Sequence, residues 1–226
     1  FNGGQIFGSP RSANTGGMLA LNIYQEEDDV VLTKDNNPYI LGFYTIPAGK
    51  RLIIEPGVII KTYYKNSSIN IYGALQINGT SDEPVVFTSG RDLLLDNNLI
   101  GQYSDGEPSA KDWQGLWFHT GAIGNLSGLD MRYAGKDFYK DGYIYTVAAS
   151  EAIRSEGANL NIQNSKFLHN GGKFIHALAG TNLTVENSVF VDGGVAIQVD
   201  GGTATLNNNE FLDFTENPPV QVIILH

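Results

Sequence analysis

The sequence contains no cysteine and comparatively few charged residues. The absence of cysteine excludes disulfide bridges and thiolate chemistry, so redox chemistry does not indicate the compartment. Charged residues make up 17 % of the 226 residues, whereas soluble globular domains usually have about a quarter. Basic residues are the scarcer kind, since 14 Lys and Arg face 24 Asp and Glu and give a formal net charge of −10. We therefore expect no nucleic-acid partner and no docking on anionic membranes, because phosphate groups would be repelled.

Long apolar runs are also missing. No apolar stretch approaches the roughly 18 residues of a membrane-spanning helix, so we expect no membrane insertion. The polar positions are filled instead by 27 Gly and 21 Asn. Both residue types accept the left-handed backbone conformations of tight turns, so this composition indicates a β protein with many corners.

One line of sequence recurs in the C-terminal half of the chain. It reads "NLNIQNSKF" from residue 159, "NLTVENSVF" from 182 and, in altered form, "TATLNNNEF" from 203. Apolar and polar residues alternate in each copy, which is typical of a strand with one buried face. A unit of about 22 residues cannot bury that face alone, whereas stacked units can. The repeat therefore predicts an all-β fold, a right-handed parallel β-helix in which single coils stack into a solenoid.

Stacking would place equivalent residues of successive coils above one another. We expect the Asn amides at one corner to hydrogen-bond along the axis and to hold a left-handed turn. A β-sandwich is the alternative architecture, but it does not explain a constant register. The expected columns are three isoleucines, three phenylalanines and three asparagines: Ile153, Ile175, Ile197; Phe167, Phe190, Phe211; Asn164, Asn187, Asn208.

The first half of the chain carries a similar pattern with a family resemblance. Residues 38–90 run from "PYILGFYTIPAGKRLIIEPGVIIK" through "INIYGALQINGT" to "PVVFTSG", and "DWQGLWF" follows at 112–118. This stretch resembles the right-handed β-helix domains of bacterial secreted and cell-surface proteins, in the pectate-lyase-like solenoid superfamily. The resemblance covers roughly residues 38–135. It implies the fold and a secreted or cell-surface location, but it does not fix an activity, since such domains occur in adhesins, wall-associated modules and polysaccharide-degrading enzymes.

The departures from the repeat divide the chain. Residues 1–37 lack it and are expected to cap the N-terminal end of one β-helix domain over 38–226. Two insertions are expected to project from the coils, at about 89–112 and 136–150. The C-terminal "NPPVQVIILH" is apolar, which predicts either a continuation of the chain or end-to-end self-association.

Aromatic residues near these insertions are candidates for ligand binding. A pyranose ring stacks its apolar face on an aromatic side chain and offers hydroxyls to polar neighbours. If Leu116 and Phe118 face the core, alternation turns the residue between them outward. The alternative is that the loop aromatics bury themselves on the wall of the solenoid. The candidate carbohydrate-contacting residues are Trp117, Tyr139, Tyr143 and Tyr145.

A weaker hypothesis is catalysis. The repeat places His169, Asp192 and Asp213 in one column, where neighbours about 5 Å apart could share a proton or a cation such as Ca²⁺. Asp is common at such turns for conformational reasons alone. The polygalacturonase-like and pectate-lyase-like signatures are absent, as are a nucleophile elbow, a phosphate loop and a zinc motif. A second polar column, Arg154, His176 and Gln198, shows no evident chemical logic in the sequence.

The sequence thus predicts a non-catalytic extracellular module of a bacterial surface or secreted protein, structural or adhesive and in contact with carbohydrate. No cofactor and no metal centre are assigned. The alternative is a polysaccharide lyase or glycoside hydrolase acting on an acidic, plant or bacterial glycan. A pure spacer without a ligand is the third hypothesis.

Overall fold

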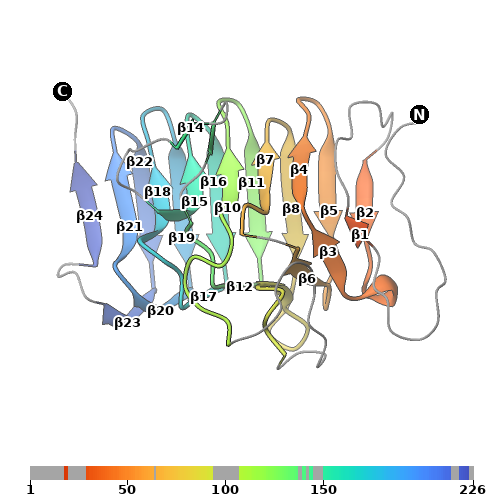
Figure 1. Cartoon of the computed structure of the whole chain (residues 1–226). Helices are drawn as coiled ribbons and strands as arrows, with labels where there is room; N and C mark the ends of the chain where they lie inside the picture. Colours follow the sequence, from red (N-terminus) through yellow and green to blue (C-terminus); the bar gives the residue numbers. More distant parts are fainter. Residues whose placement is uncertain are drawn as a thin grey trace.

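The structure, a computed structural model, describes residues 18–19, 29–63, 65–93, 107–136, 139–140, 143–144, 150–214 and 219–223. Its strands run along three sheets whose neighbouring strands are all parallel. From residue 30 onward, successive strands fall on the three sheets in turn, apart from one separate hairpin, so the chain winds around a common axis (Figure 1). This arrangement confirms the predicted right-handed parallel β-helix.

The three sheets are named A, B and C. Sheet A contains β1 (Met18–Leu19), β3 (Tyr39–Leu41), β6 (Ile59–Thr62), β9 (Val85–Thr88), β12 (Leu129–Arg132), β17 (Lys166–Leu168), β20 (Val189–Gly193) and β23 (Glu210–Phe214). Sheet B contains β2 (Val30–Leu32), β5 (Arg51–Ile54), β8 (Ala74–Asn78), β11 (Ile123–Ser127), β16 (Asn159–Gln163), β19 (Asn182–Glu186) and β22 (Thr203–Asn207). Sheet C contains β4 (Phe43–Ile46), β7 (Ser68–Ile71), β10 (Gly115–Phe118), β15 (Glu151–Ser155), β18 (Lys173–Ala177), β21 (Val195–Asp200) and β24 (Val220–Ile223).

The predicted columns of apolar residues line the interior of the solenoid. Phe167 pairs with Phe190, and Phe190 with Phe211, in the register of sheet A. The planes of the Phe167 and Phe190 rings are nearly parallel, at an angle of 4°, and the ring centroids are 4.8 Å apart. Both phenylalanines are fully buried. Like side chains therefore stack on like side chains, and this stacking buries a face that a single coil would leave exposed.

The asparagine column lies at the corner between sheets B and A. Asn164, Asn187 and Asn208 have φ angles of 51°, 51° and 52°, which is the left-handed region. The Nδ2 of Asn208 donates a hydrogen bond of 2.7 Å to Oδ1 of Asn187. Asn is one of the few residues other than Gly that adopts this conformation readily. The repeated Asn thus sets the corner at which each coil passes from one sheet to the next.

A pair of glycines allows two neighbouring coils to approach closely. Gly128 has a φ of 61°, and a Cβ atom on it would lie 2.3 Å from the backbone of Gly79. A Cβ on Gly79 would meet the carbonyl oxygen of Gly128 at 2.2 Å. Any side chain at either position would force the coils apart.

Parallel pairing begins ahead of residue 38, inside the region expected as a cap. There β1 pairs with β3 and β2 with β5, and the short 3₁₀ helix η1 (Lys34–Asn36) follows β2. Of residues 1–37 the structure describes 18–19 and 29–37.

The ends of the first expected insertion are joined at the wall of the solenoid. Phe87 and Trp113 flank it, and their buried rings lie 6.1 Å apart. The hydroxyl of Ser89 donates a hydrogen bond of 2.7 Å to Asp112, which also accepts the backbone N–H of Ser109. The second expected insertion contains a separate antiparallel hairpin, β13 (Tyr139–Lys140) and β14 (Tyr143–Ile144).

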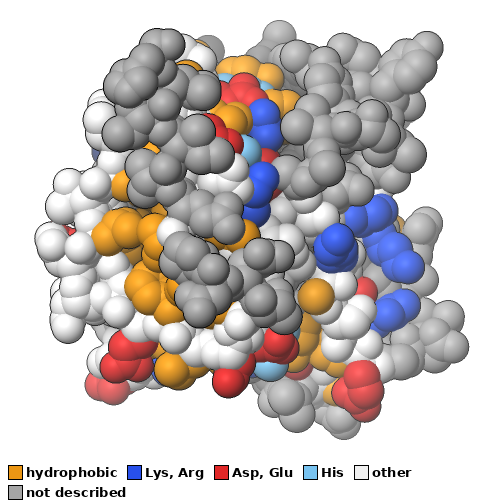
Figure 2. All heavy atoms as spheres, turned by 90° about the vertical axis from the view of Figure 1, so that its left-hand side faces the viewer, with side chains coloured by type: hydrophobic (Ala, Val, Ile, Leu, Met, Phe, Trp, Pro, Cys, Tyr) orange, Lys and Arg blue, Asp and Glu red, His pale blue; other side chains and the backbone are white. Residues whose placement is uncertain are grey.

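The C-terminal coil leaves apolar side chains at the end of the solenoid. Leu206, Phe211, Phe214 and Val220 are only partly buried against the core. Figure 2 looks onto this end and shows hydrophobic side chains gathered there. Residues 224–226 lie outside the described part, so continuation or self-association at this end stays a prediction.

Candidate functional site

Aromatic rings form a stack on the outer face of sheet C. Leu116 and Phe118 are buried, and Trp117 between them points to the other face, as alternation predicts. The ring of His119 lies 4.5 Å from that of Trp117, and the ring of Tyr72 lies 4.0 Å from that of His119 at an angle of 5°. Tyr72 is 46 % exposed, so it offers a ring to solvent at the end of the stack.

A guanidinium group extends this stack onto the next coil. The Cζ of Arg154 lies 5.5 Å from the centroid of the Trp117 ring, in cation–π range. Arg154 is held there by Glu151, at 2.9 Å from Nη1, and by Glu156, at 2.7 Å from Nε. Burial acts to lower the pKa of Arg154, but these two carboxylates outweigh it and raise that pKa above its usual value. The guanidinium is therefore both fixed in position and permanently charged.

A buried histidine continues the chain of contacts along the axis. Nδ1 of His176 is hydrogen-bonded to Oε1 of Glu151, and Nε2 lies 2.7 Å from Oδ2 of Asp200. Glu151 is 1 % exposed and His176 is 5 % exposed. Gln198 donates hydrogen bonds to both carboxylate oxygens of Asp200, at 3.1 and 2.8 Å. The three residues of the column Arg154, His176 and Gln198 are thus each hydrogen-bonded to carboxylates, which explains why polar side chains are placed there.

The charges of this cluster influence one another. Burial acts to raise the pKa of Asp200, but hydrogen bonds from Gln198 and His176 outweigh it and lower that pKa below its usual value. Burial lowers the pKa of Lys173, while the nearby carboxylates of Glu151 and Asp200 partly oppose this shift. Asp200 is accordingly an anion over the whole neutral range.

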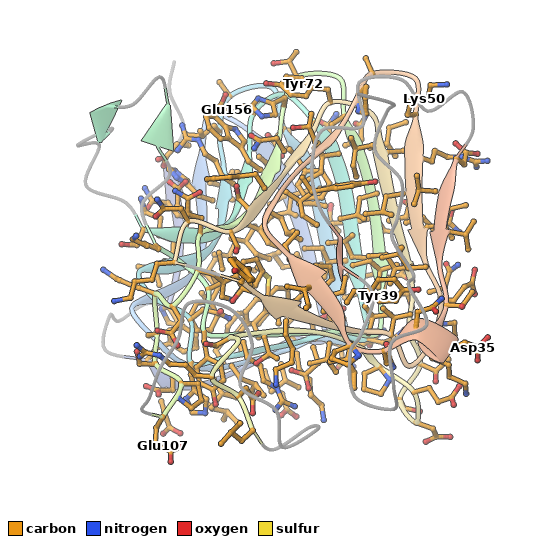
Figure 3. The ribbon with its side chains drawn as sticks, turned by 45° about the vertical axis from the view of Figure 1, so that its right-hand side comes forward. Asp35, Tyr39, Lys50, Tyr72, Glu107 and Glu156 are labelled. Atoms are coloured by element: carbon orange, nitrogen blue, oxygen red, sulfur yellow. The ribbon has the colours of Figure 1, made fainter. Side chains whose placement is uncertain are left out.

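These residues together form what we call the outer strip. It crosses strands β7, β10, β15, β18 and β21, which are consecutive neighbours in sheet C. Figure 3 labels Tyr72 and Glu156, and both lie along the upper rim of the molecule in that view. The outer strip consists of Asn70, Tyr72, Trp117, His119, Glu151, Arg154, Glu156, Lys173, His176, Gln198 and Asp200.

The tyrosines expected to bind ligand are placed only in part. Tyr139 and Tyr143 belong to the β13–β14 hairpin, and nothing is described of their side chains. Tyr145 lies outside the described residues. In Figures 1 and 3 the hairpin stands outside the coils, on the side of sheet C.

The column His169, Asp192 and Asp213 lies elsewhere, at the C-terminal ends of strands of sheet A: His169 follows β17, and the two aspartates are the last residues but one of β20 and β23. Nδ1 of His169 is 2.8 Å from Oδ2 of Asp192, but their side chains are 47 % and 62 % exposed. The φ angles of the three residues are 54°, 56° and 58°, and Tyr133 on the preceding coil has 61°. What the column shares is therefore a left-handed turn, and exposed ion pairs of this kind contribute little energy. Among the described residues, no group of three or more His, Asp or Glu side chains is placed to hold a metal ion.

The sequence interpretation missed most of the outer strip. Tyr72, His119 and Asp200 each lie two positions after an outward-facing residue of sheet C, so continued alternation could have assigned them to the outer face. The preceding residues are Asn70, Trp117 and Gln198. Glu151 gave no such signal, because it lies three positions before Arg154, which does not fit alternation. Only the contacts across the coils reveal it.

Comparisons with known proteins support the fold. The family model described as a pectate-lyase-like beta helix domain matches residues 23–102. Searches among curated proteins and among solved structures found no match. Within the part of the chain that the structure describes, no helix is both long and apolar enough to cross a membrane. Residues 23–102 are thus similar to a pectate-lyase-like β-helix domain, and the three parallel sheets show that the β-helix fold continues beyond the matched residues to β24.

Proposed function

We propose that the protein is a non-catalytic glycan-binding module, secreted or at a bacterial cell surface, that holds a linear polysaccharide along the outer strip of sheet C. The observation that supports this proposal is the stack of Tyr72, His119, Trp117 and Arg154 on one face of the solenoid. Rings beside fixed polar groups are the combination that carbohydrate ligands need.

The dimensions of the outer strip favour a linear ligand. Its five strands lie side by side, so the strip runs about 19 Å along the solenoid axis at the usual strand spacing. A chain laid along this axis would meet the exposed ring of Tyr72 first and the amide of Gln198 last. A small molecule would use only a fraction of these groups.

The groups along the strip match the chemistry of sugar hydroxyls. His119 is hydrogen-bonded to Oδ1 of Asn70 at 3.0 Å, and Gln198 is fixed by Asp200. Amides and imidazoles held in this way can donate to and accept from hydroxyl groups without large losses of side-chain entropy. A rigid β-sheet supplies the support that such positioning requires.

The test is glycan binding by the purified protein and by Tyr72→Ala. A glycan array identifies the tightest oligosaccharide, and calorimetry then measures its affinity. We expect Tyr72→Ala to weaken binding about fivefold, since an aromatic contact of this kind contributes on the order of 1 kcal/mol. The control is Leu212→Ala, an exposed apolar residue of sheet A, which should leave affinity unchanged. Absence of binding to any glycan, or equal affinities of Tyr72→Ala and the unaltered protein, would overturn the proposal.

The ion pair of His169 and Asp192 keeps catalysis as the second candidate function. Release of new reducing ends or unsaturated ends from a polysaccharide would replace the binding proposal with a hydrolase or a lyase. Asp192→Gly then tests the column, since Gly tolerates the left-handed φ at this position. Unchanged turnover in this variant would eliminate His169, Asp192 and Asp213 as the catalytic residues.

A further inference from the structure

The cations of the outer strip already face carboxylates of the same strip. The guanidinium of Arg154 contacts Glu151 and Glu156. The imidazole of His176 lies between Glu151 and Asp200. Lys173 lies in the field of Glu151 and Asp200 as well. Arg154 and His176 are thus held by carboxylates within the strip, and the field of two of these carboxylates acts on Lys173.

This internal pairing limits which ligands the strip can hold. A carboxylate ligand needs cationic donors that can turn toward it, and the strongest such contacts are bidentate ones from Arg. Arg154 could make a bidentate contact with a ligand carboxylate only by leaving Glu151 or Glu156. Glu151 is almost completely buried, so loss of Arg154 would leave His176 as its remaining contact and would be costly.

The net charge of the whole chain also disfavours the binding of a carboxylated ligand. A net charge of −10 repels a polyanion over distances up to the screening length of the solution. Divalent ions can bridge two sets of carboxylates, but the described residues contain no group placed to hold one.

We infer that the outer strip selects an uncharged linear polysaccharide and discriminates against polyuronates. This inference rests on the proposed function and names its substrate class. Tyr72 contributes an open ring, Asn70 and Gln198 contribute uncharged amides, and the ion pairs beneath act as fixed supports rather than as ligand contacts.

The experiment compares oligosaccharides that differ only in charge. The probes are hexasaccharides of β-1,4-glucan, β-1,4-mannan and α-1,4-galactan, each paired with the same chain carrying a carboxylate at C6. We expect at least one uncharged hexasaccharide to bind with a Kd that salt hardly changes. Its carboxylated counterpart should bind at least about tenfold more weakly. This difference in affinity should decrease as salt is added, because salt screens the repulsion between the ligand carboxylates and the negatively charged protein.

The outcomes separate the two claims. Tighter binding of a carboxylated hexasaccharide, weakened by salt, would overturn the inference and leave a glycan-binding strip in place. Failure of all six hexasaccharides to bind, together with an empty glycan array, would overturn the proposed function and the inference with it.

Two variants that each remove one negative charge test whether the ion pairs of Arg154 cause the discrimination. Glu156→Gln removes one of the two carboxylates that hold Arg154, and we expect carboxylated probes to bind about two- to fivefold more tightly. Glu186→Gln removes the same charge from sheet B, where Glu186 accepts a hydrogen bond from Asn207, and should change binding much less. Equal gains in both variants would show that net charge alone governs the discrimination, which would contradict the role of the pairing.

Discussion

His176 and Glu151 are hydrogen-bonded through Nδ1 and Oε1, although 25 positions separate them in the sequence. The contact exists because β15 and β18 are neighbours in sheet C, so one coil brings the two residues together. The second ring nitrogen of His176 faces Asp200. The imidazole of His176 therefore links two carboxylates that lie on different strands of sheet C.

Replacing the buried histidine should destabilise the fold. His176→Asn removes the imidazole that contacts both Glu151 and Asp200 and leaves Arg154 to hold the buried Glu151 carboxylate, and we expect the free energy of unfolding to fall by about 2 kcal/mol. Urea denaturation followed by circular dichroism measures the change. The matched control is His169→Asn, because His169 also pairs with a carboxylate but is 47 % exposed. We expect this control substitution to lower the free energy of unfolding by less than about 1 kcal/mol. Equal losses in the two variants would contradict the contribution of burial.

The Asp200 carboxylate should make part of the stability depend on pH. Burial acts to raise its pKa, but hydrogen bonds from Gln198 and His176 lower it below the ordinary value of 3.8. A depressed folded-state pKa contributes stability that is fully present above the unfolded pKa and is lost as pH falls through the folded one. We expect Asp200→Asn to be less stable than the unaltered protein at neutral pH, with a difference that shrinks below about pH 4. Urea titrations at neutral and acidic pH check this. A difference that grows on acidification would contradict the assignment.

The stacked phenylalanines should be sensitive to truncation. Phe190 lies between Phe167 and Phe211, with ring centroids 4.8 and 5.3 Å away. Phe190→Ala removes the central ring, and neighbouring coils cannot close the gap without losing their register. We expect a loss of about 3–5 kcal/mol in the free energy of unfolding, against less than about 0.5 kcal/mol for the exposed Leu212→Ala. A loss below about 1 kcal/mol for Phe190→Ala would mean that the core can collapse around the cavity.

The corner asparagines allow a test of backbone conformation alone. Asn187 has a φ of 51° and accepts a hydrogen bond from Asn208. Asn187→Gly and Asn187→Val both remove that side-chain bond, but only Val resists the left-handed conformation. We expect Val to be less stable than Gly by about 1–2 kcal/mol in thermal or urea unfolding. Equal stabilities would show that the corner relaxes when its side chain changes.

The sequence predicted the features that repeat from coil to coil. Phe167 and Phe190 share a column because the same position recurs after one turn, and the strand register of sheet A confirms it. The left-handed corner at Asn164 and Asn187 follows from the same reasoning, since Asn is favoured there for local reasons. Period and residue type are sufficient for such features.

The outer strip could not be predicted in the same way. Its central contact joins Glu151 to His176, which do not occupy equivalent positions of the repeat. Such a contact depends on side-chain direction across two coils, and a sequence pattern carries no information on that direction. The predicted column of His169 and Asp192 does meet in space, but its shared property is the turn conformation rather than burial.

The hydrogen bond between Ser89 and Asp112 has a consequence for how this protein can change. The two residues lie at the beginning and the end of the segment between β9 and β10, and their hydrogen bond joins these two ends directly. Loop closure costs rise only slowly with length, by about 0.6 kcal/mol per doubling. The segment between β9 and β10 can therefore be lengthened, shortened or exchanged while the two strands keep their positions. This makes it a suitable place to insert foreign peptides.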